Sequence, residues 1–228
     1  MVHYVVLYTH YVLPPHDSLR NTEALLLVGT SGVGKSAIAR HICETYPEDC
    51  TSPTSFTTRS PRPDDASGAY HFLSHEEVAS LKPTDIVQYI QHPDGNLYGT
   101  LIDEYRSRIS VIDAMTSSVD DFRNAGFGRV AVFGIIASSP ELQRRLDRRY
   151  PPDHPARIPR LTEALTCLLW LQDNPDVSLI LNDAPTNGPA AVEVMTQFKS
   201  KIITPRSDQL STALADDITV VTQLLHGQ

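Results

Sequence analysis

The segment that most constrains the fold is a glycine-rich run, Gly29-Thr30-Ser31-Gly32-Val33-Gly34-Lys35-Ser36. It follows the apolar stretch Ala24 to Val28, which predicts a strand buried on both faces of a parallel sheet. The residues after it, up to Tyr46, show helical spacing of apolar side chains. Glycines between such a strand and helix let the backbone wrap a phosphate, with N–H groups directed at the anion. The run therefore predicts an α/β protein with a nucleotide phosphate-binding loop. In that loop Lys35 would reach the terminal phosphates and the Ser36 hydroxyl would bind Mg²⁺.

The composition narrows the class of protein around this loop. The chain has 228 residues and a net charge of −8, which argues against a general binder of nucleic acid or of anionic membranes. No apolar run approaches the ~18 residues of a membrane span. Three cysteines in a chain of this length do not form a disulfide framework. We therefore expect a cytoplasmic protein with no nucleic-acid or membrane partner.

Arginine is unevenly distributed along the chain. There are 15 Arg and only 4 Lys, and six of the arginines lie between Arg144 and Arg160. A guanidinium group makes planar, multi-donor contacts to phosphate oxygens, whereas an ammonium group acts as a point charge. The cluster therefore indicates local phosphate recognition, with a solvated helix face as the alternative.

Strand and helix patterns alternate through most of the chain after the phosphate-binding loop. Strands are predicted at 108–113, 129–137 and 177–183. Helices are predicted near 115–125, at 139–150, at 159–172 and near 188–202. Ser139, which precedes Pro140, is the expected N-cap of the second helix.

Three segments depart from this rhythm. Residues 53–106 are rich in Pro, Ser, Thr, Gly and aromatic residues, and their short alternating runs predict a small, partly β insertion. Residues 1–21 are expected to form an N-terminal extension, either an extra strand or a loose segment. Residues 205–228 are expected to form a C-terminal extension with a weak helical tail.

The insertion carries two further motifs. In Thr57-Thr58-Arg59-Ser60-Pro61-Arg62, two arginines lie three residues apart, and Tyr70 follows them. Together these groups can hold a second phosphate in a fixed orientation. The other motif, Gly95-Asn96-Leu97-Tyr98-Gly99-Thr100, is by itself only a turn with an aromatic residue.

In this order, the three motifs resemble those of the guanylate kinase family, and the resemblance covers residues 22–204. Family members carry a GPSGxGKS loop, a TTRxPRxGExxGxxYxF segment and a GNxYG[ST] turn. The same segments read here GTSGVGKS, TTRSPRPDDASGAYHF and GNLYGT. The resemblance implies a P-loop parallel sheet flanked by helices, a nucleoside-monophosphate-binding insertion at about 53–106 and an Arg-rich lid at about 145–157.

The resemblance also implies an activity and roles for residues. The activity is ATP-dependent phosphorylation of GMP, and of dGMP, in purine nucleotide metabolism, with Mg²⁺ accompanying ATP. The chain is expected to be a monomer or an oligomer of unknown size. ATP would be bound by Gly29 to Ser36 and by Asn182. The transferring phosphoryl group would be neutralised by Lys35, Arg59, Arg145, Arg149 and Arg160. The acceptor nucleotide would be held by Ser55, Arg59, Arg62, Tyr70, Gln88, Tyr98, Thr100 and Asp113.

Several positions depart from the family pattern. The spacer before Tyr70 is one residue short, and Asp64-Asp65 replace the usual Gly-Glu. A family strand with two carboxylates is reduced to one, Asp113, which matches either of them. The family's guanine-reading Glu aligns with Gln88, although a shift of three residues would place Asp85 there.

These departures leave two alternatives to a GMP kinase. One is a guanylate-kinase-like binding module with weak or lost activity, against which the intact Lys35 and Ser36 argue. The other is a small-molecule kinase with a different phosphoryl acceptor, which the altered base-reading position Gln88 would fit.

Overall fold

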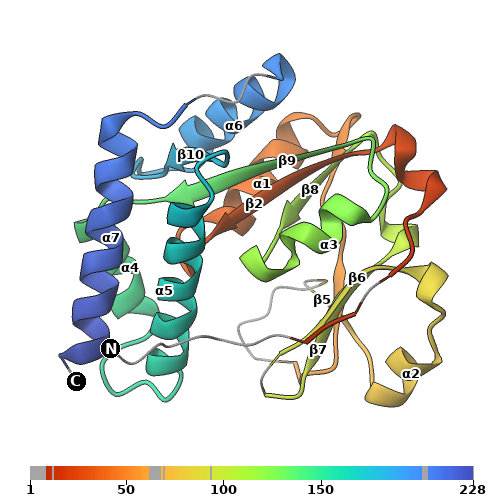
Figure 1. Ribbon diagram of the computed structural model, residues 1–228, viewed down its shortest axis with the longest axis horizontal. Coiled ribbons are helices and arrows are strands. Elements are labelled where there is room, and N and C mark those ends of the chain that lie inside the picture. Colours follow the sequence, from red (N-terminus) through yellow and green to blue (C-terminus); the bar gives the residue numbers. More distant parts are fainter. Residues whose placement is uncertain are drawn as a thin grey trace.

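A parallel sheet with helices on both faces forms the larger part of the structure, a computed structural model that describes residues 9–11, 13–61, 68, 70–92, 94–201 and 205–227 (Figure 1). Its five strands run in the order β10-β9-β2-β8-β3. They span β2 (Glu23–Gly29), β3 (Cys50–Thr51), β8 (Ile109–Asp113), β9 (Arg129–Ile136) and β10 (Ser178–Leu181). The central strand β2 pairs in parallel with both β8 and β9. The predicted α/β fold class is therefore confirmed.

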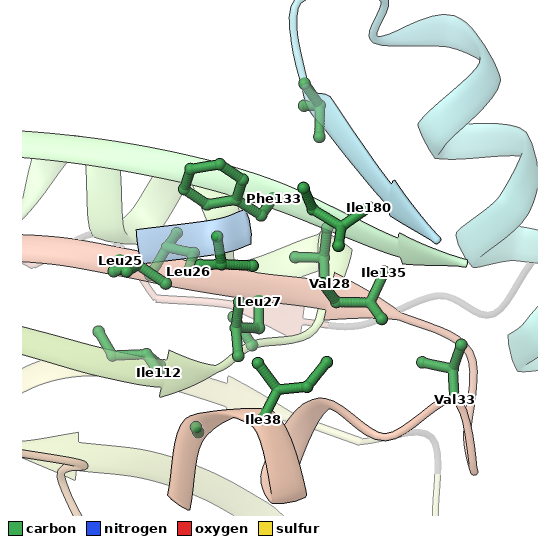
Figure 2. Close-up of a cluster of buried hydrophobic side chains, with 14 of the residues drawn as sticks. Leu25, Leu26, Leu27, Val28, Val33, Ile38, Ile112, Phe133, Ile135 and Ile180 are labelled. Atoms are coloured by element: carbon green, nitrogen blue, oxygen red, sulfur yellow. The ribbon is translucent and has the colours of Figure 1, made fainter. Parts of the chain in front are cut away.

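The continuous apolar run of β2 explains its central position. Its residues from Ala24 to Val28 are fully buried, because helices cover the sheet on both sides. Figure 2 shows Leu27 of β2 and Ile38 of α1 (Lys35–Thr45) pointing toward one another. Burying each such side chain contributes about 2 kcal/mol. This packing fixes the start of α1, and with it the phosphate-binding loop, against the sheet.

The helices form two packed groups. Helix α1 packs against α6 (Gly188–Ser200). In the other group, α7 (Asp208–His226) packs against α4 (Ser139–Arg149) and α5 (Arg157–Asp173). The short helix α3 (Val119–Asn124) contacts β9 and the smaller sheet. Short 3₁₀ segments lie at Asp17–Asn21, Pro83–Asp85, Ile102–Glu104 and Thr116–Ser118.

The insertion forms a second sheet beside the first (Figure 1). Its order is β1-β6-β7-β4-β5, with strands β1 (Thr9–His10), β4 (Ser55–Thr57), β5 (Tyr70–Phe72), β6 (Ile86–Gln91) and β7 (Leu97–Leu101). Helix α2 (His75–Ser80) begins at Ser74, whose hydroxyl accepts from the Glu77 N–H. A separate small core contains Phe56, and a Cβ on Gly99 would lie 2.4 Å from its ring, so β7 requires glycine there. The prediction of a partly β insertion agrees with this sheet.

A segment near the N-terminus joins the two sheets. Strand β1 adds to β6 as an edge strand. The His16 ring then lies 2.8 Å from the Ile86 carbonyl, and the His16 N–H donates to the Ala125 carbonyl at 2.8 Å. His16 thus holds this segment both to β6 of the small sheet and to Ala125, which directly follows α3. Residues 1–8 of the expected extension lie outside the described residues.

Two expectations about local structure are wrong. Ser138, not Ser139, occupies the N-cap position of α4, because the helix begins one residue earlier than the Pro140 signal suggested. The end of the chain is a full helix of 19 residues, not a weak tail. Leu214, Val221 and Leu225 of α7 are buried, so tertiary packing stabilises a helix that its local sequence only weakly favours.

Ser139 instead binds a buried carboxylate on α7. Its hydroxyl donates to Asp217 Oδ1 at 3.2 Å, whereas Asp217 Oδ2 has no partner among the described residues. Burial raises the pKa of Asp217 to about 7. In the folded state the group therefore keeps its proton at pH values where the unfolded chain has released it, and stability falls as pH rises toward 7.

We predict that Asp217→Asn stabilises the protein at pH 8.5 by about 1–3 kcal/mol and has little effect at pH 4, close to the ordinary pKa of an aspartate in the unfolded chain. Asparagine mimics the protonated acid and removes the cost of ionising it. Chemical denaturation at the two pH values measures the difference, with Asp216→Asn, an exposed neighbour, as the control. Equal effects of Asp217→Asn at both pH values would contradict the assignment.

Candidate active site

A cleft of about 620 Å³ lies between the two sheets and holds most of the predicted site residues. Its walls come from the phosphate-binding loop, the end of β8, strands β4, β5 and β7, and helices α4 and α5. Twelve of the predicted residues line it: Gly29, Thr30, Ser31, Lys35, Ser36, Ser55, Arg59, Tyr70, Tyr98, Asp113, Arg149 and Arg160. Seven others, Gly32, Val33, Gly34, Gln88, Thr100, Arg145 and Asn182, are not among its lining residues. Arg62 lies outside the described residues.

The phosphate-binding loop is held from behind by the end of β10. Asn182 is buried, and its Nδ2 donates to the Val33 carbonyl at 2.9 Å. Gly34 caps α1 with φ of +108°, and a Cβ there would lie 2.5 Å from Asn182 Nδ2. The loop therefore needs glycine at this position both for its backbone conformation and for the contact with Asn182.

Arg145 also holds the phosphate-binding loop in place. Its Nη1 donates to the Val33 carbonyl at 3.0 Å and its Nη2 to the Asn182 carbonyl at 2.9 Å. Glu141, one turn earlier, accepts from Arg145 Nε at 2.6 Å. The two lid arginines expected on one helix face therefore differ: Arg145 is directed at the back of the loop, whereas Arg149 lines the cleft. A catalytic role for Arg145 stays a prediction.

Lys35, Ser36 and Asp113 form a polar group at the floor of the cleft. Lys35 Nζ donates to the carbonyls of Gly29 and Thr30 at 3.0 and 3.2 Å and lies 3.6 Å from Asp113 Oδ1. The Ser36 hydroxyl donates to Asp113 Oδ2 at 2.5 Å. A hydroxyl and a carboxylate are hard oxygen donors of the kind Mg²⁺ takes. Of the two family carboxylates that Asp113 matches, this position suits one on the metal side.

The opposite wall presents a cation among aromatic rings. Arg59 is largely buried, and its guanidinium carbon lies 4.9 Å from the centroid of Tyr70. Tyr70 in turn contacts Tyr98 at a centroid distance of 6.4 Å. Burial raises the pKa of the Tyr98 phenol, so this group stays protonated and can donate a hydrogen bond. An arginine with two phenols is suited to binding a phosphate.

The positions expected to read the base lie just behind this wall. Gln88 of β6 is opposite Thr100 of β7, and both are buried. Because Tyr98 and Thr100 are two residues apart on one strand, they share a face of the sheet, and Gln88 lies on that face too. The Tyr105 hydroxyl donates to Thr100 Oγ1 at 2.7 Å. The alternative acceptor, Asp85, instead accepts from the Lys82 N–H in the segment before β6.

Among the cleft residues that sequence reasoning missed, three make side-chain contacts within the site: His92, Tyr150 and Glu163. The Tyr150 hydroxyl lies 3.0 Å from Ser31 Oγ, so it contacts the phosphate-binding loop. Glu163 follows Arg160 by three residues, and this helical spacing is a signal that could have paired them. His92 and Glu163 are 71 residues apart, and no local pattern connects them.

Cys43, Cys50 and Cys167 are free thiols, and burial raises the pKa of Cys167 to about 11. Among the described residues no cluster of His, Cys, Asp and Glu could hold a metal ion. In that same part of the chain, no helix has the length and apolar character to cross a membrane.

Comparison with known proteins identifies the family. The family model described as guanylate kinase matches residues 21–158. The guanylate kinase of Salinibacter ruber is 31% identical over 182 residues, which cover 77% of this chain and 94% of that protein. That of Rhizobium meliloti is 36% identical over 143 residues, covering 59% and 64% respectively. The crystal structure of guanylate kinase from Anaplasma phagocytophilum shares the fold, with a TM-score of 0.51 at 15% identity over 86% of this chain and 90% of that one. The chain thus belongs to the guanylate kinase family of nucleoside-monophosphate kinases.

Proposed function

We propose that this protein transfers the γ-phosphoryl group of ATP to GMP, giving ADP and GDP, and that dGMP is a second acceptor. One observation carries the proposal: a phosphate-binding loop and a second phosphate-binding wall of Arg59, Tyr70 and Tyr98 face each other across one cleft. The names of the relatives support GMP as the acceptor.

The ATP side of the cleft would work through charge. The loop N–H groups and Lys35 would hold the β- and γ-phosphates, and Ser36 with Asp113 would hold the metal. Thr30 Oγ1, which is buried without a partner among the described residues, is a further donor for a phosphate oxygen. When bound, Mg²⁺ would supply neutralisation of the transferring phosphoryl group.

The transfer itself needs positioning more than proton chemistry. The attacking phosphate of GMP is already anionic, so no general base is required, and the rate depends on alignment and charge neutralisation. Arg149 and Arg160, which reach the cleft from α4 and α5, would neutralise the charge of the transferring phosphoryl group. Ser55, Arg59, Arg62, Tyr70 and Tyr98 would hold the GMP phosphate. We take residues 22–204 as the catalytic unit, with 1–21 and 205–228 as extensions.

The test of function is ADP release from Mg²⁺-ATP with a panel of GMP, dGMP, AMP, IMP, UMP and CMP. We expect GMP and dGMP to be the best acceptors, and Lys35→Ala, which lacks the cation of the phosphate cradle, to be inactive while folded. Nucleotide binding without transfer to any member would favour a binding module. Nucleotide binding with transfer only to some other small molecule would favour a different acceptor.

Substitutions of Arg149 and of Arg145 are expected to have different kinetic effects. Arg149→Ala should lower kcat about 100-fold or more with little change in ATP affinity, because its contacts serve the transition state. Arg145→Ala should weaken ATP binding about tenfold, since the two hydrogen bonds that support the loop are lost. Steady-state kinetics and calorimetric ATP titration measure both. A loss confined to KM in Arg149→Ala would argue against its role.

Gln88 should set the base preference. Guanine presents two adjacent donors, N1–H and N2–H, which a carboxylate accepts as a pair, whereas a carboxamide leaves one donor facing another. We predict weak GMP activity with relaxed base preference, and that Gln88→Glu raises kcat/KM for GMP about tenfold to a hundredfold, selectively over AMP and IMP.

Gln91→Glu provides the matched control for this substitution. Gln91 lies three residues along the same strand and therefore on its other face. The same change of charge there should leave the base preference unaltered. If Gln88→Glu leaves GMP kinetics unchanged or worse, Gln88 does not face the base.

A further inference from the structure

A chain of charged groups connects helix α5 to the hairpin between β6 and β7. Glu163 Oε2 accepts from Arg160 Nη1 at 2.6 Å, and Glu163 Oε1 lies 3.2 Å from His92 Nε2. On the other edge of its ring, His92 Nδ1 lies 2.9 Å from Asp94 Oδ1. The side chains of Glu163 and His92 are only 22% and 19% exposed, so solvent screens the pair weakly. Arg160 is the only one of the four with a predicted role in phosphoryl transfer.

His92 and Glu163 belong to different halves of the structure, one built on each sheet. His92 directly follows β6 of the small sheet, whose wall includes Tyr98, and the two rings lie 6.1 Å apart. Glu163 and Arg160 lie on α5, which packs against β2 of the parallel sheet. The His92–Glu163 pair therefore spans the cleft, and it can form only when the two walls stand at this separation.

The ring can occupy two protonation states in this setting. A neutral His92 can donate from Nε2 to Glu163 while Nδ1 accepts from the Asp94 N–H, which lies 3.3 Å away. A protonated ring can donate to both carboxylates and adds a charge to each contact. The hydrogen bond with Glu163 raises the pKa of His92 above its usual range, although burial opposes this. Burial raises the pKa of Glu163, but His92 and Arg160 outweigh it, so the net shift is downward.

We propose that His92 and Glu163 act as positioning residues that strap the small sheet to α5 and hold Arg160 toward the bound phosphates when His92 is protonated. This proposal rests on the proposed function. It adds a pH-dependent control of cleft geometry made by residues outside the substrate-binding motifs.

The sign of the pH dependence follows from the raised pKa. The charged contact between protonated His92 and Glu163 is fully formed at pH values below the usual histidine pKa. It is lost as pH rises through the folded-state pKa of His92, above ~6.5. The charged and titratable groups recorded around it are Asp94 on the hairpin, Tyr98 on β7, Tyr150 after α4, and Arg160 on α5. The pKa values of Tyr98 and Arg160 are raised and those of Asp94 and Glu163 are lowered, so these groups keep their protonation states between pH 6 and 8 and His92 is the group that changes.

The first experiment is independent of activity. NMR titration of the His92 ring, without nucleotides, is compared between wild type and Glu163→Gln, with His41 on α1 as an internal reference. We expect a lower His92 titration midpoint in Glu163→Gln, because the charged partner is gone but the shape is kept. An unchanged midpoint for His92 would overturn the proposal that it pairs with Glu163.

The second experiment is a double-mutant cycle on kcat/KM for GMP. Wild type, His92→Gln, Glu163→Gln and the double variant are assayed at pH 6 and pH 9. Titration of the substrates affects all four equally and cancels. At pH 6 we expect each single variant to lose about fivefold and the double variant to lose no more, so that the two residues are coupled about fivefold. At pH 9 only the hydrogen bond from the neutral ring remains, and the coupling should fall to about twofold or less.

A merely structural role would give a different pattern. Equal coupling at both pH values, or purely additive losses, would overturn the proposal. If the wild type phosphorylates no GMP at all, the proposed function fails, whereas the NMR titration still decides whether the strap exists.

Discussion

The Val33 carbonyl is the point on which the site depends. It accepts hydrogen bonds from both Asn182 Nδ2 and Arg145 Nη1, and these donors come from the end of β10 and from α4. A loop rich in glycine has high conformational entropy in the unfolded chain, so its native shape must be fixed by contacts outside itself. Here one oxygen receives two donors from separate elements. The loop is thereby tied to the sheet and to the arginine-rich helix at once.

The second constraint is the spacing of the two sheets. The phosphate-binding loop belongs to the parallel sheet, whereas Arg59, Tyr70 and Tyr98 belong to the small sheet. Phosphoryl transfer requires the two phosphates to meet in a productive geometry, from which a misplacement of about 1 Å can cost about 100-fold in rate. Two features restrain this spacing: the His16 contacts with Ile86 and Ala125 at the N-terminal side, and the His92–Glu163 pair at the cleft. The His16 contacts involve no substrate-binding residue, whereas His92 and Glu163 both line the cleft.

Much of this arrangement could be predicted from the sequence because its signals are local. The apolar run of β2, the loop after it and the Arg-rich helix each lie within about a dozen residues, and each was placed correctly. The difference between Arg145 and Arg149 could not be predicted, since helical spacing puts both on one face. What separates them is the pair of acceptors, Val33 and the Asn182 carbonyl, which come from distant segments. The His92–Glu163 pair could not be predicted for the same reason, because its members come from distant segments. Nor could the full length of α7 be predicted, because the helix is stabilised by packing against α4 and α5.

The central claim is that the phosphates of both nucleotides lie in one cleft, and a bisubstrate ligand tests it directly. Adenosine and guanosine joined 5′ to 5′ through five phosphates would fill both halves of the cleft at once. Isothermal titration calorimetry should give one bound molecule per chain, at least about 100-fold tighter than GMP or ATP alone, because the second half binds without a new association cost. Binding no tighter than that of ATP, or two molecules per chain, would contradict the account.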